Sequence, residues 1–265
     1  MDYSGKIVVI TGASSGIGEQ SAEEFAKLHA NVILVSRNEE QLEKIAAELS
    51  KYQTAPFVYA CDVSNKDQVD KMSKVITEKF GAVDVLVNNA GFGIYKSVET
   101  IKIEEMESQM STNFFGMMYC IKAFLPKMLE QRSGHIVNVA SVAGSIGIPG
   151  MASYCASKFA MLGFSESLSH ELKGTGVEIT VVSPIMVRTN FFNHESFRKM
   201  PRYSATSLDS KTVANAIVRA ASSPRLEIVV PQFVRFAIWL KQTLPYLINP
   251  IVGGIFRRSM RSKMD

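Results

Sequence analysis

The chain has 265 residues, of which 46% are hydrophobic and 20% are charged. This balance is ordinary for one globular domain with a substantial core, and it excludes a low-complexity or repeat protein. The net charge of +4 does not indicate nucleic-acid binding, because the excess of basic residues is confined to the C-terminal end. From residue 225 onward the acidic residues are Glu227 and Asp265, and the basic residues are Arg225, Arg235, Lys241, Arg257, Arg258, Arg261 and Lys263.

The three cysteines of the chain are Cys61, Cys120 and Cys155, an odd number for a disulfide framework and without the paired spacing of a metal site. We therefore expect buried thiols in a reducing compartment and no bound metal. Residues 1–6 are too few and too polar to form a signal peptide. These features predict a cytoplasmic protein.

Short apolar runs rich in β-branched residues alternate with amphipathic stretches along the chain, as is typical of strands buried on both faces of a parallel sheet. We predict strands over Ile7–Thr11, Val32–Ser36, Phe57–Cys61, Val83–Asn88, His135–Ala140, Glu178–Ser183 and Glu227–Val230. We predict helices over Gly16–His29, Glu39–Tyr52, Lys66–Phe80, Ile103–Glu130, Met151–Lys173 and Ser210–Ala221. The alternation predicts an α/β fold: a Rossmann-like, doubly wound seven-stranded parallel sheet flanked by helices. It forms a single domain over residues 1–230, followed by a C-terminal extension over residues 231–265.

A glycine-rich turn joins the first predicted strand to the first predicted helix, with the sequence Thr11-Gly12-Ala13-Ser14-Ser15-Gly16-Ile17-Gly18. Glycines allow a tight turn and a close approach of the backbone to a ligand, and the helix N-terminus offers free N–H groups to a pyrophosphate. The position between a strand and a helix favours a dinucleotide site over a simple tight connection. The residues expected to contact the cofactor here are Gly12, Ser14, Ser15, Gly16, Ile17 and Gly18.

The residues after the second predicted strand bear on the choice of cofactor. An acidic residue there binds the ribose 2′-hydroxyl of NAD, whereas this chain has Ser36-Arg37-Asn38. Because arginine pairs with a 2′-phosphate through charge-assisted hydrogen bonds, we expect NADP(H) rather than NAD(H). After the third strand, Asp62 and Val63 are expected at the adenine, and an N-cap of the next helix is an equally good interpretation of Asp62.

Tyr154 and Lys158 are four residues apart in a predicted helix, and Ser141 lies upstream of them. Positions i and i+4 share one helix face, so the lysine ammonium can lie beside the phenol. A phenol normally has a pKa of about 10, and a nearby positive charge lowers that pKa. The pair is suited to moving a proton to or from an alcohol or carbonyl oxygen. Because this spacing also arises by chance in many helices, it indicates a catalytic pair only together with the nucleotide motif.

Together these motifs resemble the short-chain dehydrogenase/reductase family over roughly residues 5–230. The motifs that carry the resemblance are Thr11–Gly18, Asp62, Asn88-Asn89-Ala90-Gly91, Asn113, Ser141, Tyr154 with Lys158, and Pro184 with Thr189. One departure is Ile185, which follows Pro184 where many members have glycine. Isoleucine narrows the backbone conformations open to this loop and adds bulk near the expected nicotinamide, which affects the shape of the expected substrate pocket.

The resemblance implies a role for each of these residues. Tyr154 is expected to donate a proton in carbonyl reduction and to accept one in alcohol oxidation, while Ser141 hydrogen-bonds the substrate oxygen. Lys158 is expected to lower the pKa of the tyrosine and to hold the nicotinamide ribose, and Asn113 to kink its helix and hold a water in a proton relay towards the lysine. Cofactor contacts are expected from Asn89, Ala90 and Gly91 on the adenosine side and from Val187 and Thr189 at the carboxamide. The resemblance also implies a homodimer or homotetramer assembled through its long helices.

The C-terminal extension is apolar and ends in basic residues. Its apolar stretch is interrupted by Arg235, Lys241, Pro245 and Pro250, which disfavours a membrane-spanning helix. Two interpretations stay open: an interfacial amphipathic helix with a basic anchor, giving peripheral membrane contact, or a segment packed over the substrate cleft or a partner subunit. Both create an apolar entrance, as does the predicted substrate loop Phe191–Leu208, with Phe191, Phe192, Phe197, Met200 and Tyr203.

The sequence therefore predicts an NADP(H)-dependent oxidoreductase that transfers a hydride between nicotinamide and a carbonyl or secondary alcohol of an apolar substrate, such as a lipid or a sterol-like ring system. An alternative enzyme is a 3-oxoacyl thioester reductase. An alternative of another class is a non-catalytic NADP(H)-binding sensor, which the complete set of Ser141, Tyr154 and Lys158 argues against.

Overall fold

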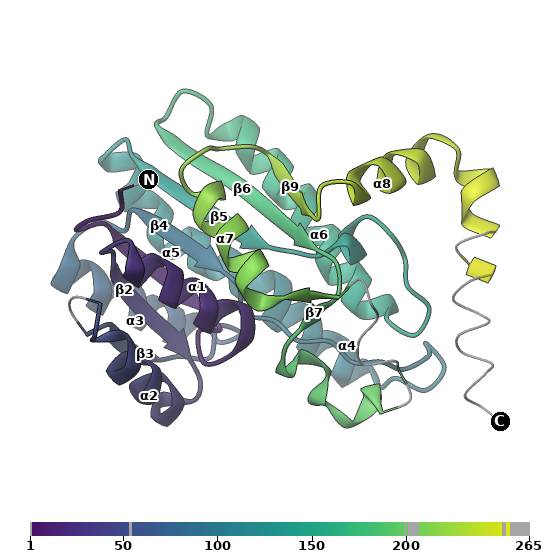
Figure 1. The fold of residues 1–265 in the computed structure, drawn as a ribbon, viewed down its shortest axis with the longest axis horizontal. Coiled ribbons are helices and arrows are strands. Elements are labelled where there is room, and N and C mark those ends of the chain that lie inside the picture. Colours follow the sequence, from purple (N-terminus) through teal and green to yellow (C-terminus); the bar gives the residue numbers. More distant parts are fainter. Residues whose placement is uncertain (1, 53–54, 199, 201–206, 251–252, 255–265) are drawn as a thin grey trace.

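A single parallel sheet forms the centre of the molecule, with helices on both faces (Figure 1). The computed structural model describes residues 2–52, 55–198, 200, 207–250 and 253–254. The seven strands lie in the order β3-β2-β1-β4-β5-β6-β9, and every pairing is parallel. Their bounds are β1 Ile7–Thr11, β2 Asn31–Ser36, β3 Phe57–Ala60, β4 Val85–Asn88, β5 Gly134–Val139, β6 Val177–Pro184 and β9 Glu227–Val230. The predicted Rossmann-like fold is confirmed, with strand ends differing from the prediction by a few residues.

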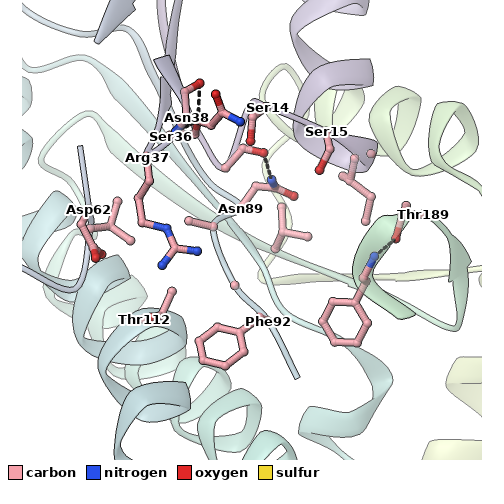
Figure 2. A pocket seen from close by; sticks show the side chains of 18 of the residues that line it. Ser14, Ser15, Ser36, Arg37, Asn38, Asp62, Asn89, Phe92, Thr112 and Thr189 are labelled. Atoms are coloured by element: carbon pink, nitrogen blue, oxygen red, sulfur yellow. Dashed lines mark hydrogen bonds between the residues drawn. The ribbon is translucent and has the colours of Figure 1, made fainter. Parts of the chain in front are cut away.

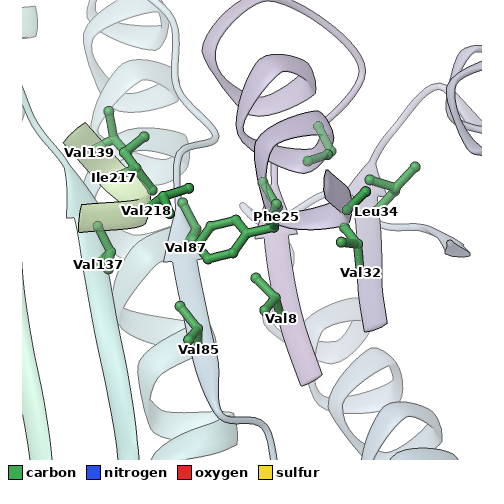
Figure 3. Packing of buried hydrophobic residues seen from close by; sticks show 14 of the residues in the cluster. Val8, Phe25, Val32, Leu34, Val85, Val87, Val137, Val139, Ile217 and Val218 are labelled. Atoms are coloured by element: carbon green, nitrogen blue, oxygen red, sulfur yellow. The ribbon is translucent and has the colours of Figure 1, made fainter. Parts of the chain in front are cut away.

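The helices divide between the two faces because side chains alternate along each strand. Val8 and Val32 face the layer of α1, α2 and α7, whereas Val9 and Ile33 face the layer of α3, α5 and α6. The helix bounds are α1 Gly16–Lys27, α2 Glu39–Leu49, α3 Lys66–Phe80, α4 Ile103–Met110, α5 Gly116–Glu130, α6 Ala152–Glu171, α7 Ser210–Ala220 and α8 Val234–Thr243. Figure 3 shows Phe25 of α1 packed over the face of the sheet that carries Val8 and Val32. Burying such a phenylalanine stabilises the fold by roughly 2–3 kcal/mol.

The helix predicted over Ile103–Glu130 contains a local change of winding. A π-helical turn over Ser111–Phe115 joins α4 to α5, and Asn113 lies at its centre. Such turns insert an extra residue into a helix and re-aim the side chains around it. The kink expected at Asn113 therefore takes the form of a π turn, which leaves the helix continuous.

Short elements near the carboxyl edge of the sheet were not predicted. Strands β7 Val187–Arg188 and β8 Leu208–Asp209 pair in parallel as a separate two-stranded sheet. Short 3₁₀ helices cover Val142–Gly144, Asn190–Asn193 and Glu195–Phe197. Elements of two to four residues carry no periodicity that a sequence pattern can reveal. The predicted loop residue Tyr203 lies outside the described residues.

His135 of β5 is a buried imidazole whose protonation is coupled to stability. Its Nε2 atom lies 2.9 Å from the hydroxyl of Thr180 on β6, and burial lowers its pKa to about 4 from an ordinary value of 6.5. The unfolded chain therefore binds the proton more readily than the folded protein between these two pH values. The stability contributed by neutral His135 is complete above pH 6.5 and is lost as the pH falls towards 4.

Between about pH 7.5 and pH 5, protonation of His135 should lower the free energy of unfolding of the unchanged protein by about 2 kcal/mol. We predict that His135→Gln lacks this part of the decrease. Urea unfolding followed by circular dichroism at the two pH values measures this difference. His170→Gln, an exposed histidine on α6, is the matched control and should leave the pH dependence unchanged. Identical pH dependence in His135→Gln and the unchanged protein would refute the assignment.

Candidate active site

One pocket at the carboxyl edge of the sheet collects nearly all the residues predicted to bind the cofactor (Figure 2). This edge is where doubly wound sheets bind ligands, at the point where the strand order reverses between β1 and β4. The predicted residues that line the pocket are Gly12, Ser14, Ser15, Gly16, Ile17, Ser36, Arg37, Asn38, Asp62, Val63, Asn89, Ala90, Gly91, Tyr154, Lys158 and Thr189. The two that do not line it are Gly18 and Val187, which are buried beside it.

The turn after β1 is held in a shape that side chains other than glycine oppose. Gly12 and Gly16 have φ angles of +65° and +61°, in the left-handed region that glycine tolerates best. A Cβ atom on Gly12 would lie 2.8 Å from the Cα of Ala90, and one on Gly18 would collide with the Gly12 carbonyl oxygen. Gly18 thus acts by letting α1 approach the turn, although it does not face the pocket itself.

The N-terminus of α1 opens into this cradle. Its N-cap, Ser15, makes no side-chain hydrogen bond to the first turn and so leaves the first amides of the helix uncapped, except that the Gly16 N–H donates to the Glu19 carboxylate. Free helix-terminal amides and the helix dipole together bind anions. The cradle that a Cβ atom would fill and these uncapped amides fit the pyrophosphate of a dinucleotide.

The turn is tied to the neighbouring strand by Asn89, which follows β4. The Thr11 hydroxyl accepts hydrogen bonds from the backbone N–H groups of Asn89 and Ala90, at 3.0 and 3.1 Å. The Asn89 amide in turn donates to the carbonyl oxygens of Thr11 and Gly12, at 3.0 and 3.2 Å. These bonds fix the two sides of the crevice at one separation.

Arg37 points into the pocket from the end of β2 (Figure 2). Its side chain is exposed and forms no ion pair or hydrogen bond with any residue in the described ranges. Its neighbours are already engaged: the Ser36 hydroxyl accepts from the Asn38 N–H at 3.1 Å, and Asn38 caps α2 through Gln41. A guanidinium in this position is free to pair with an anionic ligand.

Asp62 lines the pocket after β3, and the structure decides between its two interpretations. The N-cap of α3 is Asn65, whose side chain accepts from the Gln68 N–H at 3.1 Å. The alternative in which Asp62 caps this helix is therefore wrong. One carboxylate oxygen of Asp62 accepts from the backbone and the hydroxyl of Ser64, at 3.0 and 2.7 Å, which holds the carboxylate in place at the pocket wall.

Of the predicted catalytic side chains, Tyr154 and Lys158 line the pocket, while Ser141 lies beside Tyr154 and Asn113 is buried behind the pocket wall. Tyr154 and Lys158 lie one turn apart on α6, and Ser141 follows β5 as the N-cap of a 3₁₀ turn, accepting from the Ala143 N–H at 3.1 Å. Ser141 forms a hydrogen bond with the Tyr154 phenol, which brings the two hydroxyl groups to one point. The Lys158 ammonium lies 5.7 Å from the centre of the Tyr154 ring.

Burial sets the protonation of this pair. Tyr154 is 9% exposed and Lys158 is 4% exposed. Desolvation raises the pKa of Tyr154 above its ordinary value, and the hydrogen bond with Ser141 opposes this shift only in part. Desolvation also lowers the pKa of Lys158 to about 7, while its ammonium donates to the Val139 carbonyl oxygen at 2.9 Å. The Tyr154 pKa is therefore shifted upward, opposite to the expected effect of the lysine, because desolvation is its largest cause and burial also disfavours the charge of Lys158.

Asn113 holds the loop after β4 against the catalytic helix. Its side-chain amide donates to the Phe92 carbonyl oxygen at 3.0 Å and to the Ser157 hydroxyl at 2.9 Å, and its carbonyl oxygen accepts from the Phe92 N–H at 2.9 Å. Ser157 then donates to the Tyr154 carbonyl oxygen at 2.7 Å. This buried residue is thus engaged with protein groups on both sides. Its expected water relay to Lys158 stays a prediction.

An apolar cluster adjoins Tyr154. Phe191 packs edge-on against the Tyr154 ring with centroids 5.5 Å apart, and it also contacts Phe192 and Phe197 at 5.0 and 5.7 Å. The cluster is completed by Tyr95, Ala143, Ile148, Met151, Cys155, Met186 and Met200. Tyr154 therefore stands at the boundary between the dinucleotide pocket and an apolar cluster.

Some residues that line the pocket were not predicted from the sequence to contact the cofactor. They are Cys61, Phe92, Thr112, Val139, Ala140 and Phe191. Phe92 and Thr112 each adjoin a predicted residue, Gly91 and Asn113, so adjacency in the chain was the available signal. Thr189, which was predicted, caps the 3₁₀ turn that carries Phe191, accepting from the Phe191 N–H at 3.3 Å.

The fold and the pocket define a dinucleotide-binding oxidoreductase with a tyrosine, a lysine and a serine at the reacting end. A family model described as short chain dehydrogenase matches residues 6–199. The chain therefore belongs to the short chain dehydrogenase family. It is an oxidoreductase that acts on alcohol or carbonyl groups with a nicotinamide cofactor.

Known proteins from distant organisms share both sequence and structure with this chain. It is 34% identical over 252 residues to human 17-beta-hydroxysteroid dehydrogenase 13, covering 94% of this chain and 82% of the relative. A short chain dehydrogenase/reductase from Burkholderia phymatum, solved with NAD, superposes with a TM-score of 0.83 at 28% identity over 93% of this chain and 96% of that one. An alcohol dehydrogenase from Thermococcus sibiricus, solved with 5-hydroxy-NADP, superposes with a TM-score of 0.76 at 30% identity over 84% and 95%. Relatives of the same fold thus carry either form of the cofactor.

We predict that Tyr154→Phe lowers kcat by about a thousandfold, because the group that exchanges the proton is removed. Binding of NADPH should stay within about twofold, since the ring and its packing remain, whereas Lys158→Ala should weaken both turnover and binding. Steady-state assays measure kcat, and fluorescence titration with NADPH measures cofactor binding.

Tyr95→Phe is the matched control, because Tyr95 lies in the same apolar cluster without lining the dinucleotide pocket. It should retain turnover. If Tyr154→Phe kept most of its activity, the phenol would not be the proton donor.

Proposed function

We propose that this protein is an NADP(H)-dependent reductase and dehydrogenase for a carbonyl or secondary alcohol on an apolar substrate. The observation that carries the proposal is the position of Tyr154. It lines the dinucleotide pocket together with Lys158, and its ring packs against the apolar cluster at Phe191. A proton donor at this boundary can serve a reaction between a polar cofactor and an apolar substrate.

The preference for the phosphorylated cofactor rests on Arg37. Its guanidinium lines the pocket at the end of β2 and has no acidic partner within the described ranges. The carboxylate that an unphosphorylated ribose needs at the end of β2 is replaced by Ser36. A 2′-phosphate offers Arg37 a bidentate, charge-assisted hydrogen bond that a hydroxyl cannot match.

The substrate class rests on the aromatic and thioether side chains beside the phenol. Phe191, Phe192 and Phe197 contact one another, Phe191 also packs against Tyr154, and Met151, Met186 and Met200 complete these apolar walls. Removing an apolar ring system from water against such walls supplies binding energy of about 25 cal/mol per Å². The name of the human relative, a hydroxysteroid dehydrogenase, agrees with a rigid apolar substrate.

The chain's own residues supply proton transfer and alignment. Bound in the pocket, the nicotinamide supplies the hydride for reduction and takes it in oxidation. Because desolvation keeps Tyr154 protonated, the phenol is ready to donate to a carbonyl oxygen held by the Ser141 hydroxyl. In the oxidation direction the phenolate oxygen, which the Lys158 ammonium stabilises, accepts the proton of the alcohol and becomes the phenol again.

We also propose that the protein is a homodimer or homotetramer whose subunits meet through α5 and α6. Apolar side chains on these helices are left partly open: Phe115 precedes α5 and is 39% exposed, and Phe159 of α6 is 45% exposed. Covering them with a second copy removes apolar surface from water, as expected of a stable interface. Sedimentation equilibrium measures the oligomeric state.

We predict that Arg37→Ala raises the Kd for NADPH by about tenfold to a hundredfold and changes the Kd for NADH by less than about twofold, because one charge-assisted bidentate contact is lost. Titration calorimetry with both cofactors measures the effect. Lys44→Ala, which removes an exposed cation from α2 outside the pocket, is the matched control. An equal loss for both cofactors would show that Arg37 does not recognise the 2′-phosphate.

We predict that kcat/KM for ketones of growing apolar size rises about threefold to fourfold for each added buried methylene, with NADPH as the donor. Oxidation of NADPH against graded ketones and acyl thioesters measures this series, with NADH as comparator. Phe191→Ala should shift the size optimum upward, whereas Phe159→Ala, on the outer face of α6, should not. Activity on acyl thioesters alone would select the 3-oxoacyl thioester reductase, and no turnover of any substrate would favour the sensor.

A further inference from the structure

The C-terminal segment after β9 exposes apolar side chains on its outer face. We define the tail surface as Phe233, Phe236, Trp239, Leu244, Tyr246 and Leu247, whose exposed fractions run from 44% for Leu244 to 93% for Tyr246. A helix on the surface of a globular protein ordinarily turns polar residues outward. Large apolar patches that remain open mark sites of interaction.

The inner face of α8 fixes this segment to the body of the protein. Ile238 is buried, the Lys241 ammonium donates to the Ser145 carbonyl oxygen at 3.0 Å, and Arg235 donates to the Glu227 carbonyl oxygen at 3.3 Å. Residues 245–250 continue as a further helical stretch at the margin of the molecule (Figure 1). The tail surface is therefore presented outward by an anchored helix.

The charge of the segment identifies what it meets. Arg235 and Lys241 hold α8 to the body of the protein. The basic residues that remain available lie in the sequence beyond the described residues, which carries Arg257, Arg258, Arg261 and Lys263 against the single acidic residue Asp265. A second copy of this chain seated on the same surface would bring two basic ends together, which is unfavourable. An anionic lipid surface complements both the basic end and the exposed rings, because tryptophan and tyrosine favour the headgroup region.

We propose that the tail surface binds the surface of an anionic lipid bilayer. The described residues include no helix long and apolar enough to cross a membrane. We place the segment in the interface, with its rings among the headgroups and the basic C-terminal end of the chain on lipid phosphates.

The same contact places the bilayer beside the substrate side of the active site. Ser145, which accepts from Lys241, follows the 3₁₀ turn that Ser141 caps, and the segment from Ser145 leads to Ile148 and Met151 of the apolar cluster. An apolar substrate dissolved in the bilayer would reach the cluster without crossing water. This consequence, unlike the lipid binding itself, rests on the proposed function.

Flotation of the full-length protein with lipid vesicles tests the proposal. Vesicles of phosphatidylcholine are compared with vesicles in which about a third of the lipid is phosphatidylglycerol. We expect binding to the anionic vesicles to exceed binding to the neutral ones by at least about tenfold and to weaken as salt is raised to about 0.5 M. The double variant Phe236→Ser with Trp239→Ser, and separately Arg257→Glu with Arg258→Glu, should each lower binding by at least about tenfold.

Matched controls lie outside the tail. Val98→Ser removes an apolar side chain that is 66% exposed, as Phe236 is at 65%, and Lys74→Glu reverses an exposed cation on α3; both variants should bind as the unchanged protein does. Turnover of a small water-soluble ketone without vesicles verifies that each variant is folded and separates this test from the test of the proposed function.

Two results would overturn the proposal. One is equal binding to vesicles by the unchanged protein and the variant with Phe236→Ser and Trp239→Ser. The other is absence of vesicle binding together with a concentration-dependent increase in mass that this variant loses, since the tail surface would then be an interface between copies of this chain.

Discussion

The carboxamide of Asn113 is the buried group on which the geometry of the active site depends. It pairs with both backbone groups of Phe92 after β4 and with Ser157 on α6, and Ser157 in turn bonds the Tyr154 carbonyl oxygen. A buried amide with satisfied partners is rigid, because breaking any one bond leaves a polar group without water. The wall of the dinucleotide pocket and the helix that carries the phenol are thereby held in one fixed relation. The π turn is the backbone conformation that aims Asn113 at both.

The same burial that gives this rigidity also sets the acid–base chemistry. Water is removed from both members of the tyrosine–lysine pair, so each is pushed towards its neutral form. The phenol is therefore held in its protonated form, ready to donate, while the amine of Lys158 is shifted towards neutrality. Forming the phenolate requires a positive charge beside it that offsets the cost of desolvation.

Much of the fold was accessible from sequence because each strand and helix carries its own signal. Continuous runs such as Ile7–Thr11 leave no polar face, so they had to be strands covered on both sides. The glycine turn was accessible for a related reason, because Gly12 adopts a backbone conformation that few other residues tolerate. The roles of Thr112 and Phe92 in the pocket were not, because neither residue type signals a ligand and only the packing of two segments brings them together.

The order of the motifs along the chain determined the fold class, the family and the grouping of pocket residues, because local propensity and short-range spacing are properties of the sequence itself. The tertiary structure alone decided three further matters: the N-cap of α3, which is Asn65 and not Asp62; the upward shift of the Tyr154 pKa; and the anchoring of α8 through Lys241 to Ser145. The N-cap is a local choice between neighbouring side chains that can do the same task. The pKa shift and the anchoring depend on groups that come together from distant parts of the chain. Desolvation is a property of the assembled packing, and no spacing along the chain encodes its magnitude.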